Sequence, residues 1–324
     1  MARLYGPCQE GYPMLGYVFM RVLGLIGVTL VVSFITFAML YRLPGGPFDE
    51  SKQPLSATAL ANVRAKYNLD KPFYIVWASY MWNAAHGDFG TSYQAEGKPI
   101  IEIFREQWGT SLLLGVLALA WSIPLGIYFG LVAATRRNSV VDYIFRFTSV
   151  VGTTVPNFAL AVFGVFIFSV LLRWLPTGGW LPKDDPRTLV MPVIIFGLLP
   201  FGIIMRYTRN GVLETLTQDH VRTARAKGLS SNTILMQHTF RNALIPLVTI
   251  LAALIPNALT GSAILERAFR INGIGKYFID AVGTRDYPMV MATVLIVAVL
   301  WGTFFLIADL IYTLVDPRIR VHKG

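Results

Sequence analysis

The sequence contains little charge and almost no cysteine. Asp, Glu, Lys and Arg make up 14% of its 324 residues, about half of the roughly 25% found in soluble domains. So little charge excludes a disordered chain or a protein that wraps nucleic acid, despite the net charge of +10. The one cysteine, Cys8, excludes a disulfide framework and a metal site built from several thiolates. Because 54% of the residues are hydrophobic and the mean hydropathy is +0.55, the composition is that of an integral membrane protein.

Three kinds of chemical site are also missing from the sequence. The histidines lie far apart, without the spacing of metal ligands, at His86, His220, His238 and His322. No Gly-x-x-x-x-Gly-Lys-Ser/Thr phosphate loop occurs, so the chain cannot hydrolyse ATP by itself. No histidine lies in the middle of an apolar run, which argues against an intramembrane hydrolase, because that needs a nucleophile and a base at membrane depth. We therefore expect no metal site, no cofactor and no catalytic residue.

Six apolar stretches are long enough to cross a bilayer, which takes about 20 residues of helix. They cover residues 19–41, 110–134, 148–172, 188–205, 243–264 and 290–313. The first is uncharged from Val22 to Tyr41, longer than the apolar part of a signal peptide, so we expect it to be retained. The fourth is the shortest and contains Pro192 and Pro200. The fold class predicted is an all-α membrane protein with six transmembrane helices.

The distribution of positive charge predicts which side of the membrane each loop occupies. The side that holds both termini, the segment 136–146 and the loop 206–241 carries 14 basic and 5 acidic residues, a net charge of +9. The other side carries 14 basic and 12 acidic residues, a net charge of +2. Both termini are therefore expected in the cytoplasm. Because the basic excess lies on loops beside lipid, we expect membrane lipid and not nucleic acid as its partner.

This topology divides the chain into four parts. They are an N-terminal segment with the first span (1–41), a large external loop (42–108), a five-helix core (109–315) and a cytoplasmic tail (316–324). In the external loop, residues 55–68 are predicted to form an amphipathic helix, and an aromatic stretch from Phe73 to Trp82 has spacing that suits one helix face. These aromatic residues either pack a small cap or form a membrane-interface belt, or they provide a docking surface for an external protein.

The cytoplasmic loop 206–241 contains a predicted helix, tight turn and second helix. Alanine and long basic side chains favour a helix from Asp219, Gly228 suits its C-terminus, and Ser230 or Ser231 can cap the next helix. The ordinary interpretation is a solvated basic face. The alternative is an elbow at 219–230 whose small side chains at Ala224, Ala226 and Gly228 allow another protein to contact its backbone closely.

Several motifs of this chain, in order, resemble those of the permeases of the oligopeptide, dipeptide and nickel branch of ABC importers. The coupling segment is Arg222-Thr-Ala-Arg-Ala-Lys-Gly-Leu229, followed by Arg241-Asn-Ala-Leu-Ile-Pro246. The other motifs are Leu43-Pro-Gly-Gly-Pro47, His86-Gly-Asp-Phe-Gly90, Pro156-Asn-Phe158, Glu266-Arg-Ala-Phe269, Gly273-Ile-Gly275, Arg285-Asp-Tyr-Pro288 and Asp316-Pro-Arg318. The resemblance covers nearly the whole chain and is strongest to the subunit with a long first external loop, the OppB/DppB type. Where the wider superfamily has Glu-Ala-Ala, this chain has Arg222, Thr223 and Ala224.

The resemblance implies an ABC importer type I permease fold that alternates between outward- and inward-facing states. It implies four kinds of partner: a second permease subunit, two ATP-binding subunits, an external solute-binding protein and the lipid bilayer. The resemblance favours a homologue over a second copy of this chain as the second permease subunit. ATP and magnesium are then used by the partner ATPase subunits, and this chain is not itself an enzyme. The residues expected to couple it to an ATPase subunit are Asp219, His220, Arg222, Thr223, Ala224, Arg225, Ala226, Lys227, Gly228 and Leu229.

Other residues are candidates for the path and for docking. Prolines at mid-span interrupt helices, and broken helices often line transport pathways, so Pro156, Asn157 and Phe158 are either near the translocation path or at a structural kink. Glu266, Arg267 and Arg270 follow the fifth span outside and either form salt bridges or contact a docked binding protein.

Two further features leave alternatives open. Gly126 and Gly130 permit close helix approach, within this chain or with a sister permease. Asp309 is the only acid well inside a predicted span, and we interpret it as lying at the cytoplasmic interface rather than as an ion-coupling group.

The function expected is import of di- or oligopeptides delivered by an external binding protein. Permeases of the same scaffold for nickel, glutathione or small saccharides are the alternative within transport. A secondary transporter is the alternative of another class, but it would usually contain several buried acids or histidines.

Overall fold

The computed structural model describes residues 14–42, 71–95, 97–240, 243 and 245–315. Within this part the chain is helical, with one isolated bridge between Thr91 and Pro99. The long helices are α1 (Met14–Arg42), α4 (Ile100–Thr135), α7 (Arg187–Thr215) and α14 (Tyr287–Val315). The others are α3 (Phe73–Ala85), α5 (Val140–Thr154), α6 (Asn157–Gly164), α8 (Asp219–Ala226), α9 (Ser231–Thr233), α11 (Ile245–Leu259), α12 (Ala263–Ala268) and α13 (Ile274–Thr284), with two π-helical segments, Val165–Leu171 and Ile234–Phe240. The predicted helix at 55–68, the motif from Leu43 and the C-terminal tail lie outside the described residues.

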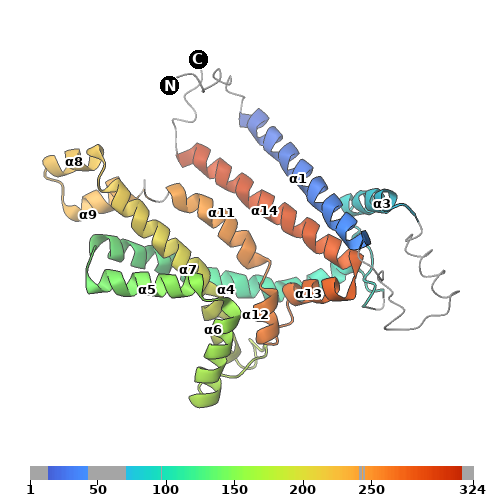
Figure 1. The fold of residues 1–324 in the computed structure, drawn as a ribbon. Helices are drawn as coiled ribbons and strands as arrows, with labels where there is room; N and C mark the ends of the chain where they lie inside the picture. The colour runs from blue at the N-terminus through green and yellow to red at the C-terminus, as the bar shows by residue number, and fades with distance from the viewer. Residues whose placement is uncertain (1–13, 43–70, 96, 241–242, 244, 316–324) are drawn as a thin grey trace.

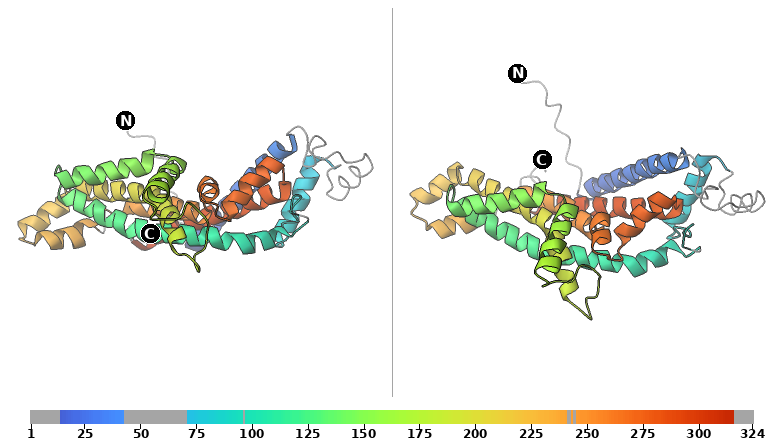
Figure 2. Two further views of the ribbon diagram at one scale, coloured as in Figure 1. Left: turned by 90° about the horizontal axis from the view of Figure 1, so that it is seen from below. Right: turned by 60° about the horizontal axis from the view of Figure 1, so that its bottom comes forward.

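The molecule is elongated, with its two loop regions at opposite ends. Figure 1 shows α8 and α9 at one end and α3 at the other, and both views in Figure 2 agree. The ends of α1 and α14 that lead to the two termini lie on the same side of the molecule (Figure 1). This arrangement matches the predicted topology, in which the termini share one side and the external loop lies on the other.

Helices α4 and α7 form the most extensive helix pair in the fold. A Cβ atom added at Gly130 would lie 2.7 Å from the Met205 carbonyl oxygen, and one added at Gly126 would lie 2.9 Å from the Ile204 side chain. The two backbones approach this closely only because both positions lack a side chain. Of the two alternatives for these glycines, the structure therefore supports packing within this chain.

The third predicted span is not a single straight helix. The residues predicted as one span over 148–172 form parts of two helices, α5 and α6, bent by 107° at Pro156. Proline disfavours the helical conformation of the residue before it, and Val155 is accordingly extended, with φ −79° and ψ 123°. The apolar stretch also begins earlier, at Val140, so the prediction of a span over 148–172 was wrong in shape and bounds.

The other prolines do not break their helices, contrary to the sequence-based expectation. Pro192 and Pro200 lie inside the continuous α7, and Pro124 lies inside α4. Each proline removes one backbone hydrogen bond, but 61% of the most apolar part of α7 is buried against neighbouring helices. Packing on both sides thus maintains the helix through its prolines.

The remaining spans are confirmed with shifted ends. In the part of the chain that the structure describes, five helices are long and apolar enough to cross a membrane, and the bent pair makes a sixth if it is counted as one span. Helix α4 begins at Ile100, inside the segment predicted as external loop, and α7 continues to Thr215, inside the predicted loop 206–241. The fifth span turns at Gly261, where φ is +77°, and continues as α12.

Helix α3 contains the aromatic stretch and packs partly against α1. Trp77 donates a hydrogen bond to Ser33 (3.1 Å) and meets Phe34 edge to face at 5.2 Å. The Tyr80 hydroxyl donates to the Pro288 carbonyl (3.2 Å), and burial raises the pKa of Tyr80, so the phenol stays a donor. Trp82 is 70% exposed. One face of α3 therefore forms the expected cap, while the other is open.

The packing of α4 against α7 predicts that a single methyl group at Gly130 is harmful. Gly130→Ala places its Cβ against the Met205 carbonyl, and such overpacking costs about 1–3 kcal/mol. We expect a lower thermal unfolding midpoint of the purified protein in detergent. The matched control is Gly27→Ala, which has no atom within 4 Å of the added methyl and should leave the midpoint unchanged or slightly raised. Equal midpoints for both variants would contradict this account of the helix pair.

Candidate functional site

The candidate coupling site is the elbow formed by α8, the turn after it and the start of α9. It follows α7 directly and lies at the end of the molecule farthest from α3 (Figures 1 and 2). Thr217 and Gln218 continue the turn out of α7 through hydrogen bonds to Glu214 and Thr215 carbonyl oxygens. Only three residues separate the two helices, so the position of α8 depends on the end of α7.

Short-range signals form the elbow as the sequence predicted. Gly228 adopts a φ of +76°, and its N–H donates to the Arg225 carbonyl (2.9 Å), which ends α8 in the manner typical of glycine. The Ser230 hydroxyl then accepts a hydrogen bond from the Thr233 N–H (3.3 Å) and caps α9. The predicted helix, tight turn and second helix are confirmed.

The inner face of the elbow packs on its own support. Val221 and Ala224 are buried in a small apolar cluster with Ile234, and Leu216 packs against the cluster from the end of α7. The Ala224 side chain is therefore turned inward, and close contact of another protein with the backbone here stays a prediction. Because α8 has only eight residues, this cluster rather than helix propensity fixes its orientation.

The outer face of the elbow is open along its whole length. Nine of the ten predicted coupling residues are exposed, namely Asp219, His220, Arg222, Thr223, Arg225, Ala226, Lys227, Gly228 and Leu229. A side chain built at Gly228 would meet no atom within 4 Å. The tip therefore presents backbone and small side chains, with basic side chains beside them, and can enter a groove of another protein.

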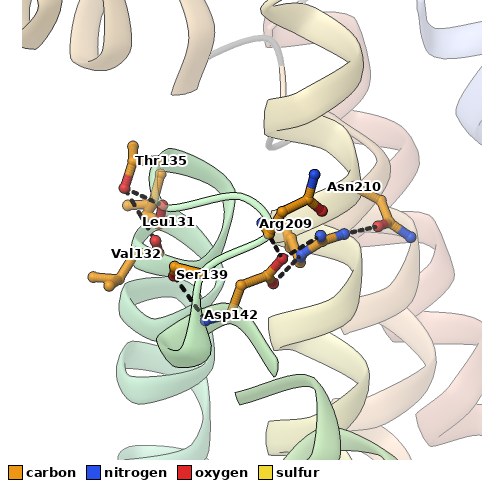
Figure 3. A network of polar contacts seen from close by, with 8 residues as sticks. Leu131, Val132, Thr135, Ser139, Asp142, Arg209 and Asn210 are labelled. Carbon is orange, nitrogen blue, oxygen red and sulfur yellow. Dashed lines mark hydrogen bonds and ion pairs between the residues drawn. The ribbon is translucent and has the colours of Figure 1, made fainter. Parts of the chain in front are cut away.

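An ion pair that the sequence did not reveal lies at the base of the elbow. Asp142 of α5 accepts two hydrogen bonds from Arg209 of α7, both of 2.7 Å (Figure 3). The Asp142 carboxylate also accepts from the Asn138 N–H (3.1 Å), and the Ser139 hydroxyl caps α5 by accepting from the Asp142 N–H. The side chain of Asp142 is fully buried and that of Arg209 is 13% exposed.

This pair connects the elbow to the rest of the core. Arg209 lies in the same unbroken helix as Thr215, so a force on the elbow reaches Arg209 through helical backbone. A two-point Arg–carboxylate contact fixes orientation as well as distance. The cytoplasmic ends of α5 and α7 are therefore held as one unit. Asp142 and Arg209 are 67 residues apart, and neither belongs to a motif that would have identified it.

The predicted path residues lie at the bend between α5 and α6. Pro156 precedes α6 as its N-cap residue, Asn157 is half-buried, and Phe158 is exposed. The bend is packed against α7, because a Cβ at Gly152 would lie 2.5 Å from the Leu198 carbonyl oxygen. The three residues are thus together at a sharp turn of the chain, and their role in transport stays a prediction.

The structure separates the three predicted docking residues. Glu266 has no exposed surface and accepts hydrogen bonds from Ser111 (2.7 Å) and from the Lys276 N–H (2.9 Å), so it cannot contact a docked protein. Arg267 forms an ion pair with Asp280. Arg270 is exposed, with φ +56°. Of the two alternatives for this group, bonding within the chain holds for Glu266, through hydrogen bonds, and for Arg267, through its ion pair. Docking of a binding protein stays a prediction for Arg267 and Arg270.

Asp309 pairs with another helix instead of standing alone. Its carboxylate lies 3.1 Å from the Arg21 guanidinium, near the start of α1. Arg21 and Asp309 both lie within apolar helices, Val18–Arg42 and Tyr287–Ile311, so the interpretation of Asp309 as an interfacial residue stays a prediction. Among the described residues no group of three or more His, Cys, Asp or Glu side chains is placed to hold a metal ion.

Comparisons with known proteins match nearly the whole chain. Residues 126–321 match the model of the binding-protein-dependent transport system inner membrane component, and residues 14–104 match the N-terminal model of the same membrane components. The dipeptide transport system permease protein DppB of Bacillus subtilis is 36% identical over 310 residues, covering 96% of this chain and 99% of its own.

Two further relatives agree with this match. The oligopeptide transport system permease protein AppB of Bacillus subtilis is 36% identical, covering 95% of this chain and 100% of its own. DppB of Lactococcus lactis is 34% identical with the same two coverages. A chain of the inward-facing MetNI methionine ABC transporter is 17% identical with a TM-score of 0.42, covering 69% of this chain and 96% of its own.

The buried pair at the base of the elbow predicts strongly coupled effects on stability. Asp142→Asn or Arg209→Gln alone leaves one charged or polar partner unpaired, which costs of the order of 3 kcal/mol. The double variant should cost clearly less than the sum of the two, since it leaves no lone charge. The thermal unfolding midpoints in detergent of the parent, the two single variants and the double variant form a double-mutant cycle that measures this coupling. The exposed pair Lys98 and Glu106 is the control, and its removal should change the midpoint little. Additive effects at Asp142 and Arg209 would contradict the coupling.

Proposed function

This chain belongs to the family of binding-protein-dependent transport system inner membrane components, and from that premise we propose which solute it carries and how it is driven. It is a membrane permease subunit of an ABC importer, located in the cell membrane. We propose that it translocates di- or oligopeptides delivered by an external solute-binding protein. The observation that carries the proposal is the 36% identity, over nearly its whole length, to peptide permeases.

The proposed assembly contains this chain, a second homologous permease subunit, two ATP-binding subunits and the external binding protein. ATP and magnesium act in the ATP-binding subunits, and the permease supplies the membrane-embedded passage. The elbow is proposed to sit in a groove of one ATP-binding subunit, where closure of the nucleotide sites moves it as a rigid body.

Three features of the elbow support this role. It is exposed on its outer face, it is fixed on its inner face by Val221 and Ala224, and it is joined to α7 by three residues. A rigid, protruding element of this kind transfers displacement with little loss, because packed clusters switch position rather than deform continuously. The ion pair of Asp142 and Arg209 then carries the displacement of α7 to α5 and towards the bend at Pro156.

The remaining site residues fit the same scheme as proposals. Pro156, Asn157 and Phe158 are proposed to lie near the translocation path, since the bend exposes Phe158 beside a helix break. Arg267 and Arg270, between the fifth and sixth spans, are proposed to face the binding protein. The four parts of the chain, 1–41, 42–108, 109–315 and 316–324, keep their proposed roles as first span, external loop, core and tail.

A bulky residue at the tip of the elbow should separate the permease from its ATPase. Gly228→Trp adds a large side chain at a positive φ, where the added Cβ atom meets no other atom within 4 Å, so it obstructs the partner's groove. We expect the variant to reach the membrane but to lose co-purification of the ATP-binding subunits, peptide uptake and stimulated ATP hydrolysis. Gly87→Trp, also at a positive φ with free space around it, is the control at the opposite end of the molecule. Normal uptake by Gly228→Trp would remove the elbow from the mechanism.

Uptake by reconstituted vesicles tests the substrate class. Vesicles that contain the complete transporter, the binding protein outside and ATP inside should accumulate labelled di- or oligopeptides. Vesicles with this chain alone should accumulate none, because it contains no nucleotide-binding loop. Transport of nickel, glutathione or small saccharides in place of peptides would overturn the proposed substrate, and uphill transport by the chain alone would overturn its role as a subunit.

A further inference from the structure

A pocket of about 360 Å³ lies between the cytoplasmic halves of α5 and α7. Its lining comes from two helix faces, with Arg146, Ser149 and Val150 on α5 and Met205, Arg206, Arg209 and Asn210 on α7. The volume is at the lower end of the roughly 300–1,000 Å³ typical of small-ligand sites. Three arginines around so small a space make the pocket distinct from the apolar surface of the spans.

Two of the three arginines form no salt bridge among the described residues, although Arg146 interacts electrostatically with Asp142. Arg209 is neutralised by Asp142, whereas Arg146 and Arg206 are exposed and belong to none of the salt bridges formed in the described part of the chain. Their described contacts are with tyrosine rings, Arg146 with Tyr143 at 5.3 Å and Arg206 with Tyr207 at 5.9 Å. The pocket therefore has an excess of about two positive charges.

The polar groups of the pocket suit a phosphate. Guanidinium groups present planar pairs of donors that match phosphate oxygens. The Arg209 guanidinium is held in place by its two bonds to Asp142, so the pocket has one arginine fixed in position and two free to close on an anion. The Asn210 side chain provides further hydrogen-bonding capacity at the same rim.

The position of the pocket indicates where such a phosphate comes from. Arg206 lies nine residues before the end of α7 at Thr215, about 13 Å along the helix, between the cytoplasmic elbow and the apolar body. Tyr143 and Tyr207 are exposed beside it, as tyrosines are at membrane interfaces. Ile144 and Phe147 of α5 are also exposed, by 56% and 69%, and offer apolar surface for acyl chains next to the arginines.

We propose that this pocket binds the phosphate group of an anionic phospholipid from the cytoplasmic leaflet. The phosphate lies between Arg146 and Arg206, and the acyl chains lie along the exposed apolar side chains of α5. The lipid then bridges α5 and α7 next to the pair of Asp142 and Arg209. Free phosphate has the same charge chemistry but gains nothing from the apolar surface, so the lipid is the ligand assigned.

Lipid retention by the assembled transporter tests the assignment. The complex is purified in a mild detergent, titrated with phosphatidylglycerol, and its bound lipid is quantified by native mass spectrometry. Arg146→Gln/Arg206→Gln should weaken binding about thirtyfold, since each basic residue near anionic lipid contributes roughly a factor of five. Arg146→Lys/Arg206→Lys should retain most of the binding because it keeps both charges. Arg136→Gln/Arg137→Gln, which removes two exposed charges from the turn after α4, is the matched control and should lose much less binding, because these side chains lie outside the pocket.

Each other outcome overturns the proposal in a recognisable way. Equal phosphatidylglycerol binding by the parent and Arg146→Gln/Arg206→Gln, or equal losses in the glutamine pair and the control pair, would mean that the pocket is not a lipid site. Displacement of phosphatidylglycerol by inorganic phosphate at millimolar concentration would assign the pocket to a free anion instead. Equal binding of phosphatidylcholine and phosphatidylglycerol would show that charge does not select the ligand. Peptide uptake is not needed as a readout, so failure here is distinct from failure of the proposed transport function.

Discussion

The close contact between α4 and α7 is the constraint on which the rest of the structure depends. Without a side chain at Gly126 or Gly130, the backbone of α4 reaches the carbonyl groups and side chains of α7 directly. In a bilayer, helices do not gain free energy by hiding apolar surface from water, so contact of this kind has to come from close packing. The elbow, the bend and the arginine pocket are all attached to one member of this helix pair.

Two ion pairs join helices of the core. Asp142 with Arg209 links α5 to α7, and Asp309 with Arg21 links α14 to α1. A desolvated ion pair such as that of Asp142 and Arg209 contributes little net stability, but its geometry selects one arrangement of the helices over others.

The elbow and the cap formed by α3 lie at opposite ends of the molecule (Figure 1). The elbow exposes an outer face with basic and small side chains, while its inner face is fixed by apolar packing. The cap holds one face of α3 against α1 through Trp77 and leaves Trp82 exposed. The chain belongs to the inner membrane component family, and both ends of the molecule present surface that its own fold does not cover.

The sequence by itself determined the membrane class, the number of apolar stretches, the sidedness and the local structure of the elbow. These follow from composition, from the length of apolar runs and from short-range signals such as Gly228 and Ser230, which act within a few residues. Only the tertiary structure decided that α5 and α6 bend by 107° at Pro156 while α7 passes unbroken through Pro192 and Pro200. It also decided that Glu266 and Ala224 turn inward and that Asp142 meets Arg209. The physical reason is that a proline or a charge has the same local preferences wherever it occurs in a sequence. Residues distant in sequence determine whether packing compensates for the hydrogen bond that a proline removes or for the desolvation of a buried charge.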